Sequence, residues 1–114
     1  MPLTTATKES AAGHIAGLGD WISLHTGDPT ASGANEATGG SPAYARKQTT
    51  WSAGSSDGIY SGTEVSIDVP AGTYTYAGVW SASTSGTFRG SQAITSSTVG
   101  GQTVIKVTPS ITVS

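Results

Sequence analysis

The clearest alternation of apolar and polar residues runs from Glu64 to Val69. Within this stretch Val65, Ile67 and Val69 alternate with polar side chains. Successive side chains of a β-strand point to opposite faces of the sheet, so the pattern predicts a strand with its aliphatic side chains in the core and its carboxylates in water. The Pro-Ala-Gly sequence that follows is expected to end the strand.

A second short strand is predicted at residues 21–25. Ile22 and Leu24 point to one face, and Trp21, Ser23 and His25 point to the other, so we expect one face of this strand in the core. A Gly-Asp-Pro turn follows, because Asp can bond its own downstream backbone and Pro presets a turn dihedral.

The stretch from residue 30 to residue 41 has no periodicity. A loop this long inside a compact domain is either functional or disordered. It returns to an aromatic and basic segment that contains Tyr44 and Arg46, within a predicted strand at residues 43–51. Neither face of that strand is cleanly apolar, which is typical of a sheet edge or a subunit interface.

A further strand is predicted from Thr73 to Trp80, with an aromatic row on one face. The row consists of Tyr74, Tyr76 and Trp80, and Gly78 interrupts it where a bulge or a close backbone approach would fit. The row could form a wall of the core, a subunit interface, or a platform that stacks sugars. We favour core or interface, with Trp80 in the core beside Ile22, Leu24 and the aliphatic residues of the 64–69 strand, because strand alternation requires a buried face.

The remaining elements define the expected fold. Residues 1–19 are predicted to form a short N-terminal helix or arm, which Thr4 or Thr5 caps and two glycines end. Short strands are also expected at residues 87–93, at 103–108 and around Ile111 and Val113. Six to eight short strands separated by turns predict an all-β fold, a two-sheet antiparallel sandwich of jelly-roll type, as one domain over residues 20–114.

Composition excludes several classes of partner. Charged residues make up only 11% of the 114-residue chain, the net charge is −2, and the chain has no cysteine. We therefore expect no contact with nucleic acid or an anionic membrane, and no disulfide or thiolate metal site. No signal peptide or membrane span is predicted, because no stretch of about 18 apolar residues occurs.

Catalytic interpretations are weak, and we predict no catalytic residue and no cofactor. The segment 54–58 matches G-x-S-x-G but lacks the strand-to-helix setting that exposes a nucleophile. Glu64 and Asp68 share a strand face, but alternation explains them as a solvated face.

A metal site is also not predicted. His25, Asp28 and Glu36 could be drawn as ligands, but a second imidazole at ligand spacing is absent. We expect His25 to be a half-exposed histidine at the end of its strand.

Several segments resemble one protein family. They are SLHTGDP, GANEATGG, AYARK and TTW within residues 23–51, IDVPAGT at 67–73, AGVWSA at 77–82 and GTFRG at 86–90. Together they resemble a family of small tailed-bacteriophage virion proteins, which are described as capsid decoration or minor tail proteins. The resemblance implies a non-enzymatic structural protein that is made in the bacterial host cytoplasm and resides in the virion.

The function that we expect is capsid decoration, in which the protein binds the outside of the head as an accessory protein. The partners would be the lattice of the major capsid protein or tail proteins of the same phage. The alternatives are a minor tail protein, and a carbohydrate-binding module that contacts the host cell surface.

We also expect a homo-oligomer, because a chain of this size without disulfides or metal has only a modest core. Aromatic and Arg side chains are enriched at interface centres. The residues predicted to lie near such an interface are Tyr44, Arg46, Trp51, Asn35 and Glu36.

Overall fold

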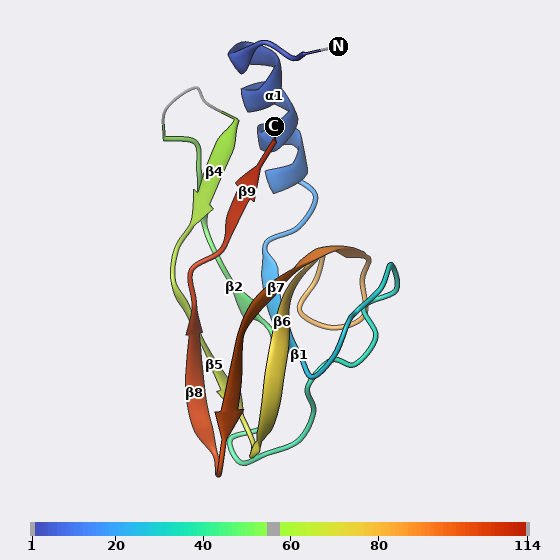
Figure 1. Ribbon diagram of the computed structural model, residues 1–114, viewed down its shortest axis with the longest axis vertical. Coiled ribbons are helices and arrows are strands. Elements are labelled where there is room, and N and C mark those ends of the chain that lie inside the picture. The colour runs from blue at the N-terminus through green and yellow to red at the C-terminus, as the bar shows by residue number, and fades with distance from the viewer. Residues whose placement is uncertain (1, 55–57, 114) are drawn as a thin grey trace.

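The computed structural model describes residues 2–54 and 58–113, which contain one helix and nine strands (Figure 1). The helix α1 spans Thr5–Ala16. The strands are β1 (Trp21–His25), β2 (Lys47–Gln48), β3 (Trp51–Ser52), β4 (Ile59–Gly62), β5 (Val65–Val69), β6 (Gly72–Trp80), β7 (Phe88–Val99), β8 (Thr103–Val107) and β9 (Ser110–Thr112). Residues 55–57, within the G-x-S-x-G match, lie outside the described residues.

The strands form three antiparallel sheets. The largest has the strand order β2-β1-β6-β7, the second has the order β3-β4-β9, and β5 pairs with β8. The prediction of an all-β, sandwich-like antiparallel fold with a short N-terminal helix is confirmed. The number of sheets was predicted wrongly, since the layer opposite the large sheet is divided into two.

The division of this layer has a local cause. Between β8 and β9 the chain passes through Pro109, which has no N–H to donate to a sheet ladder. Between β4 and β5, the hydroxyl of Thr49 donates to the carbonyl oxygen of Thr63 at 2.8 Å, so a side chain takes the place of a ladder bond. The strand predicted at 43–51 is only partly present: residues 43–46 are not in a strand, and the chain is interrupted between β2 and β3, which pair in different sheets.

The hydrophobic core lies between the large sheet and the β5-β8 pair. In β5 the side chains of Val65, Ile67 and Val69 are buried, and they pack with Ile22 and Leu24 of β1. Trp80, the sixth residue expected in the core, is also buried, at 9% exposure. It does not belong to this cluster and instead packs edge-on against Phe88.

The expectation that β1 buries only one face is wrong. Ser23 and His25, on the face opposite Ile22 and Leu24, are fully buried. They pair across the sheet with Gly78 and Tyr76 of β6. A Cβ atom on Gly78 would lie 2.7 Å from the Ser23 hydroxyl oxygen, so glycine is needed there for close packing.

The aromatic row of β6 is not uniform. Tyr74 is buried in the hydrophobic cluster, whereas Tyr76 is partly exposed, and the register with β7 shifts between the two. A second shift lies between Val79 and Trp80. The irregularities therefore flank Gly78 instead of coinciding with it, and the row offers no continuous aromatic surface.

The N-terminal helix packs on its own chain. The side chain of Thr4 accepts a hydrogen bond from the backbone N–H of Thr7 and caps α1. Ala12 is fully buried, and Gly13 faces Tyr60 of β4. Helix α1 and the small β3-β4-β9 sheet thus form one end of a molecule with extents of 46 × 25 × 24 Å (Figure 1).

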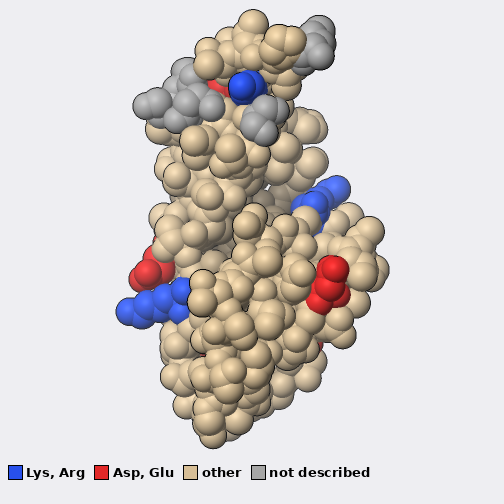
Figure 2. Space-filling view, in the orientation of Figure 1, with Lys and Arg blue, Asp and Glu red and all other residues tan. Residues whose placement is uncertain are grey.

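The surface carries few charges, and in the view of Figure 2 these lie singly or in small groups of opposite sign between uncharged areas. In the described part of the chain, the helix is neither long nor apolar enough to cross a membrane.

The core position of β5 predicts a large effect of truncation at its centre. Replacing Ile67 with alanine should lower the free energy of unfolding by about 2–5 kcal/mol, because a fully buried side chain leaves a cavity. Ser66→Ala, at the exposed neighbouring position, is the control and should change stability by less than about 0.5 kcal/mol. Urea unfolding of both variants tests this, and equal midpoints would contradict the described core.

Candidate functional site

A long loop between β1 and β2 covers the part of the outer face of the large sheet that carries His25 and Trp80. It begins with hydrogen bonds that continue the pairing of β1, from the N–H of Ala37 to the carbonyl oxygen of Leu24 and from the N–H of Thr26 to that of Asn35, both 2.9 Å. The carboxylate of Asp28 accepts from the N–H of Thr30 at 2.8 Å, the turn role expected from the sequence. The loop is therefore ordered and folded against the sheet.

The loop approaches the sheet most closely at Gly33. Its φ of +79° is in the left-handed region, and a Cβ atom there would lie 2.4 Å from the Trp80 ring. Asn35 also has a positive φ, and its side-chain amide donates to the carbonyl oxygen of Asp28 at 3.0 Å. Glycine at position 33 thus allows the loop to contact the Trp80 indole, and asparagine at position 35 stabilises the conformation of the loop.

Arg46 and Glu36 form an ion pair that ties the end of the loop to its middle. The Nε atom of Arg46 donates to one carboxylate oxygen of Glu36 at 2.8 Å, and Nη2 donates to the other at 2.9 Å. The Tyr44 hydroxyl donates to the same carboxylate at 2.7 Å. A two-pronged contact of this kind fixes both side chains in one geometry.

The same guanidinium joins the loop to a second loop and to the sheet. Its Nη1 atom donates to the carbonyl oxygens of Ala82 and Ser85, at 3.0 and 2.9 Å. The guanidinium carbon lies 3.6 Å from the centre of the Trp80 ring, within cation–π distance. Arg46 therefore connects the long loop, the segment after β6 and the surface of the large sheet.

A chain of buried hydrogen bonds lies under this contact. The Trp80 indole N–H donates to the hydroxyl oxygen of Ser23 at 3.0 Å, and that hydroxyl lies 2.7 Å from Nε2 of His25. The other ring nitrogen of His25, Nδ1, lies 2.8 Å from the carbonyl oxygen of Ala34. Because a carbonyl oxygen can only accept, Nδ1 carries the proton, and neutral Nε2 accepts from Ser23.

Electrostatics favour this arrangement at neutral pH. Burial lowers the pKa of His25 and outweighs the hydrogen bond to Ala34 and the nearby charge of Glu36, which act in the opposite direction. Burial alone would raise the pKa of Glu36, but hydrogen bonds from Arg46 and Tyr44 lower it below its usual value. Burial and the bond to Glu36 together raise the pKa of Tyr44. The ionised pair and the neutral imidazole are thus the stable forms.

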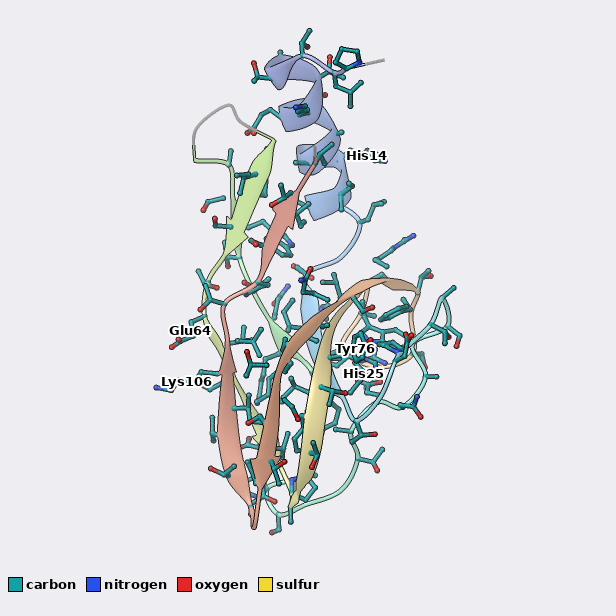
Figure 3. All side chains as sticks on the ribbon, viewed as in Figure 1. His14, His25, Glu64, Tyr76 and Lys106 are labelled. Carbon is teal, nitrogen blue, oxygen red and sulfur yellow. The ribbon has the colours of Figure 1, made fainter. Side chains whose placement is uncertain are left out.

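The expectation of a half-exposed His25 is wrong, because the loop covers the ring completely. Both of its nitrogens have partners. In the residues that the structure describes, no group of three or more side chains could hold a metal ion. Figure 3 shows His14 on the helix, away from His25 and Tyr76, which are neighbours in the large sheet, and from Glu64 and Lys106.

The five residues predicted for an interface fall into two places. Glu36, Tyr44 and Arg46 form the network described above, and Asn35 is an exposed residue of the same loop. Trp51 lies in a cleft beside β7 and β9, where its indole N–H donates to the carbonyl oxygen of Gly19 at 2.9 Å. A role for these residues in oligomer contacts stays a prediction, but the polar atoms of Arg46 already have partners in its own chain.

Sequence reasoning missed the intramolecular role of Arg46. The low share of charged residues, 11%, showed only that few carboxylates could pair with Arg46, and not which of them does. The contribution of Ser23 could not be inferred from the sequence, because it depends on the loop folding back over β1.

Arg46→Ala should destabilise the fold by about 2–4 kcal/mol, because it leaves Glu36 largely buried without its charged partner. The control is Arg89→Ala, at an exposed arginine with one described hydrogen bond, which should cost less than about 0.5 kcal/mol. Urea unfolding of both variants measures the difference. A stable Arg46→Ala protein would mean that the ion pair does not hold the loop.

The network also predicts acid sensitivity. Since the folded state lowers the pKa of His25 below 6.5, stability should be complete above that pH and should decrease as pH falls through the folded pKa. The lowered pKa of Glu36 adds a further loss below its usual value of 4.5.

Unfolding midpoints measured between about pH 7.5 and pH 5 would test the first step. His25→Gln should flatten the pH dependence over this range, whereas His14→Gln, at an exposed position of α1, should keep the slope of the parent. An equal slope in all three proteins would contradict the role of His25.

Comparison with known proteins identifies the family to which the chain belongs. The model of the family described as "Podophage GP4 fiber I protein gp80" matches residues 18–111, which include the loop, the polar network and all nine strands except the last residue of β9. No curated protein and no solved structure matches the chain. Because the match covers most of the sequence, the chain belongs to this family and is a phage structural protein.

Proposed function

We propose that this protein is a repeated structural subunit of a phage fibre, and that it acts without catalysis. The family match over residues 18–111 carries the proposal, because the matched segment contains β1 to β8 and most of β9. The elongated form, 46 Å long and about half as wide, is compatible with a subunit stacked along a fibre. The protein would be a component of the virion.

The polar network supports a structural role. Ser23 and His25 lie at hydrogen-bond distance, but both are fully buried and their partners are Trp80 and the backbone of Ala34. A catalytic pair must reach a substrate, and this pair lies under the loop. Its role is to hold the loop to the sheet, which gives the subunit a fixed outer surface.

Capsid decoration is the alternative function, and it would place the protein on the head of the particle instead of in a fibre. In both locations the protein would bind virion proteins in many copies, and repetition can make weak contacts strong. Electron microscopy of particles labelled with an antibody against this chain separates them. Label at the tail or its fibres is the expected result, label distributed over the head would favour decoration, and particles without the protein would contradict a structural role.

A carbohydrate-binding role is the second candidate. The aromatic row is a poor platform for it, because Tyr74 and Trp80 are 2% and 9% exposed. Trp51 is the better candidate, since it lines a cleft of about 610 Å³, a volume in the range of ligand sites. Binding to host cell envelopes that Trp51→Ala abolishes would support this function, and equal retention of both proteins would count against it.

A further inference from the structure

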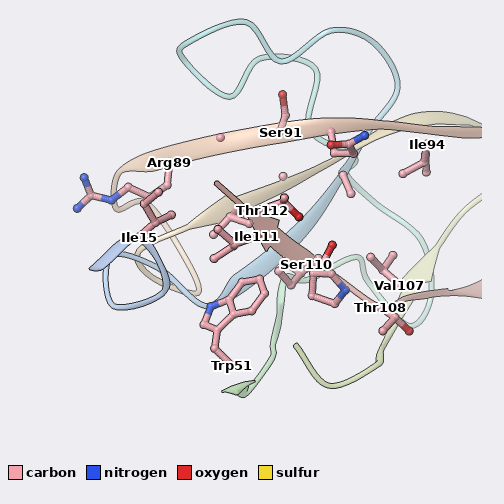
Figure 4. A pocket seen from close by; sticks show the side chains of 17 residues that line it. Ile15, Trp51, Arg89, Ser91, Ile94, Val107, Thr108, Ser110, Ile111 and Thr112 are labelled. Atoms are coloured by element: carbon pink, nitrogen blue, oxygen red, sulfur yellow. The ribbon is translucent and has the colours of Figure 1, made fainter. Parts of the chain in front are cut away.

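One edge of the large sheet has no partner in the described chain. Strand β7 is the outermost strand in the order β2-β1-β6-β7, and it is not hydrogen-bonded to β8, the next strand in sequence. Beside it lies the cleft of about 610 Å³, between β7 and residues 107–112 (Figure 4). Ile22 and Val79 line the cleft from the large sheet, and Ile111 lines it from β9. The sandwich is therefore open along the edge of β7.

The edge is regular over a short segment. Gly90 to Ala93 pair in unbroken register with Val79 to Tyr76, and the register shifts on both sides of this run. Because paired residues share a face, Gly90 and Gln92 lie on the same face as Val79 and Ala77. Only this segment and its immediate neighbours can accept another strand without rearrangement.

The segment contains an unfilled position and a side chain that could fill it. A Cβ atom on Gly90 would meet no other atom within 4 Å, in contrast to the tightly packed Gly78. Four residues further on, Ile94 is a partly buried apolar side chain that also lines the cleft. The gap at Gly90 and the isoleucine thus lie on the same side of one strand edge.

We propose that this edge binds a second copy of the chain by antiparallel β7–β7 pairing, with Gln92 on the two-fold axis. In this register each Ile94 lies opposite Gly90 of the other copy and fills the open space there. An antiparallel pair has its axis perpendicular to the sheet, so both clefts stay on the same face. One segment supplies both halves of the contact, which is why a second copy fits better than an unrelated strand.

Charge is compatible with self-pairing. Arg89 is the only charged residue of β7, and it lies at the register shift beside Gly90, outside the segment that pairs in the proposed dimer. Like charges directly opposite each other, which destabilise sheets, are therefore avoided. The edge also lacks proline, lysine and the inward-pointing charges that commonly block edge pairing.

The pairing should be weak in isolation. Five residues opposite five give roughly five main-chain hydrogen bonds, about half the number in a standard interface. In a particle, where copies are held close together, the effective concentration would compensate for this. Self-association is a property of the chain itself, so its failure would leave the proposed place in the virion untouched.

A like-charge pair on the two-fold axis tests the proposal. Gln92→Lys should be tolerated in the folded chain, because Gln92 is exposed, but it would place two lysines directly opposite each other in the dimer, which destabilises strand pairing. The control is Gly101→Lys, which adds the same charge at a position where a Cβ atom meets nothing within 4 Å and φ is not positive. Sedimentation up to millimolar concentration should show self-association of the parent and of Gly101→Lys, and at least tenfold weaker association of Gln92→Lys. A monomeric parent, or equal association of all three, would overturn the proposal.

Cysteine trapping gives a second measurement. The chain has no cysteine, and directly opposite residues of an antiparallel pair are close enough for a disulfide. Gln92→Cys should form a disulfide-linked dimer under mild oxidation. Ser66→Cys, on the exposed face of β5, should stay mostly monomeric. Equal cross-linking of the two variants would contradict the two-fold axis at Gln92.

Discussion

The contact of the Arg46 guanidinium with Glu36 and Trp80 is the interaction on which much of the structure depends. The chain has few other charged groups. The side chains of Arg46 and Glu36 are largely shielded from water, and the guanidinium lies over the Trp80 ring. The guanidinium has a donor for each of the two loops and a flat face for the indole. One side chain thereby fixes the segment before β2, the middle of the long loop and the segment after β6.

The covering loop changes the character of the large sheet. Without it, the face of β1 that carries Ser23 and His25 would be a polar surface in water. With it, these groups are buried, and each finds a partner in a chain that runs from the Trp80 indole to the Ala34 carbonyl. Burial of polar groups is tolerated because all of them are satisfied, and such a network fixes a single arrangement of the loop.

The outer and inner faces of the large sheet are therefore covered differently. The loop of the same chain covers the outer face of the large sheet over His25 and Trp80, whereas the layer facing its inner side is divided near Pro109 and leaves a cleft beside β7. One side of the large sheet is thus held by contacts within the chain, whereas on the other side, in the described residues, the edge of β7 is unpaired and apolar side chains line a cleft.

The sequence by itself determined the class of fold and the interior of its strongest strands. Alternation in EVSIDV defined β5 and its buried side chains, and Ile22 and Leu24 were identified in the same way, because period-two patterning is a local property. Only the tertiary structure decided the state of His25, the partners of Arg46 and the division of the second layer. Each of these depends on contacts between residues far apart in sequence, such as Arg46 with Ala82 or Thr49 with Thr63, and no local pattern encodes which distant carbonyl a side chain will reach.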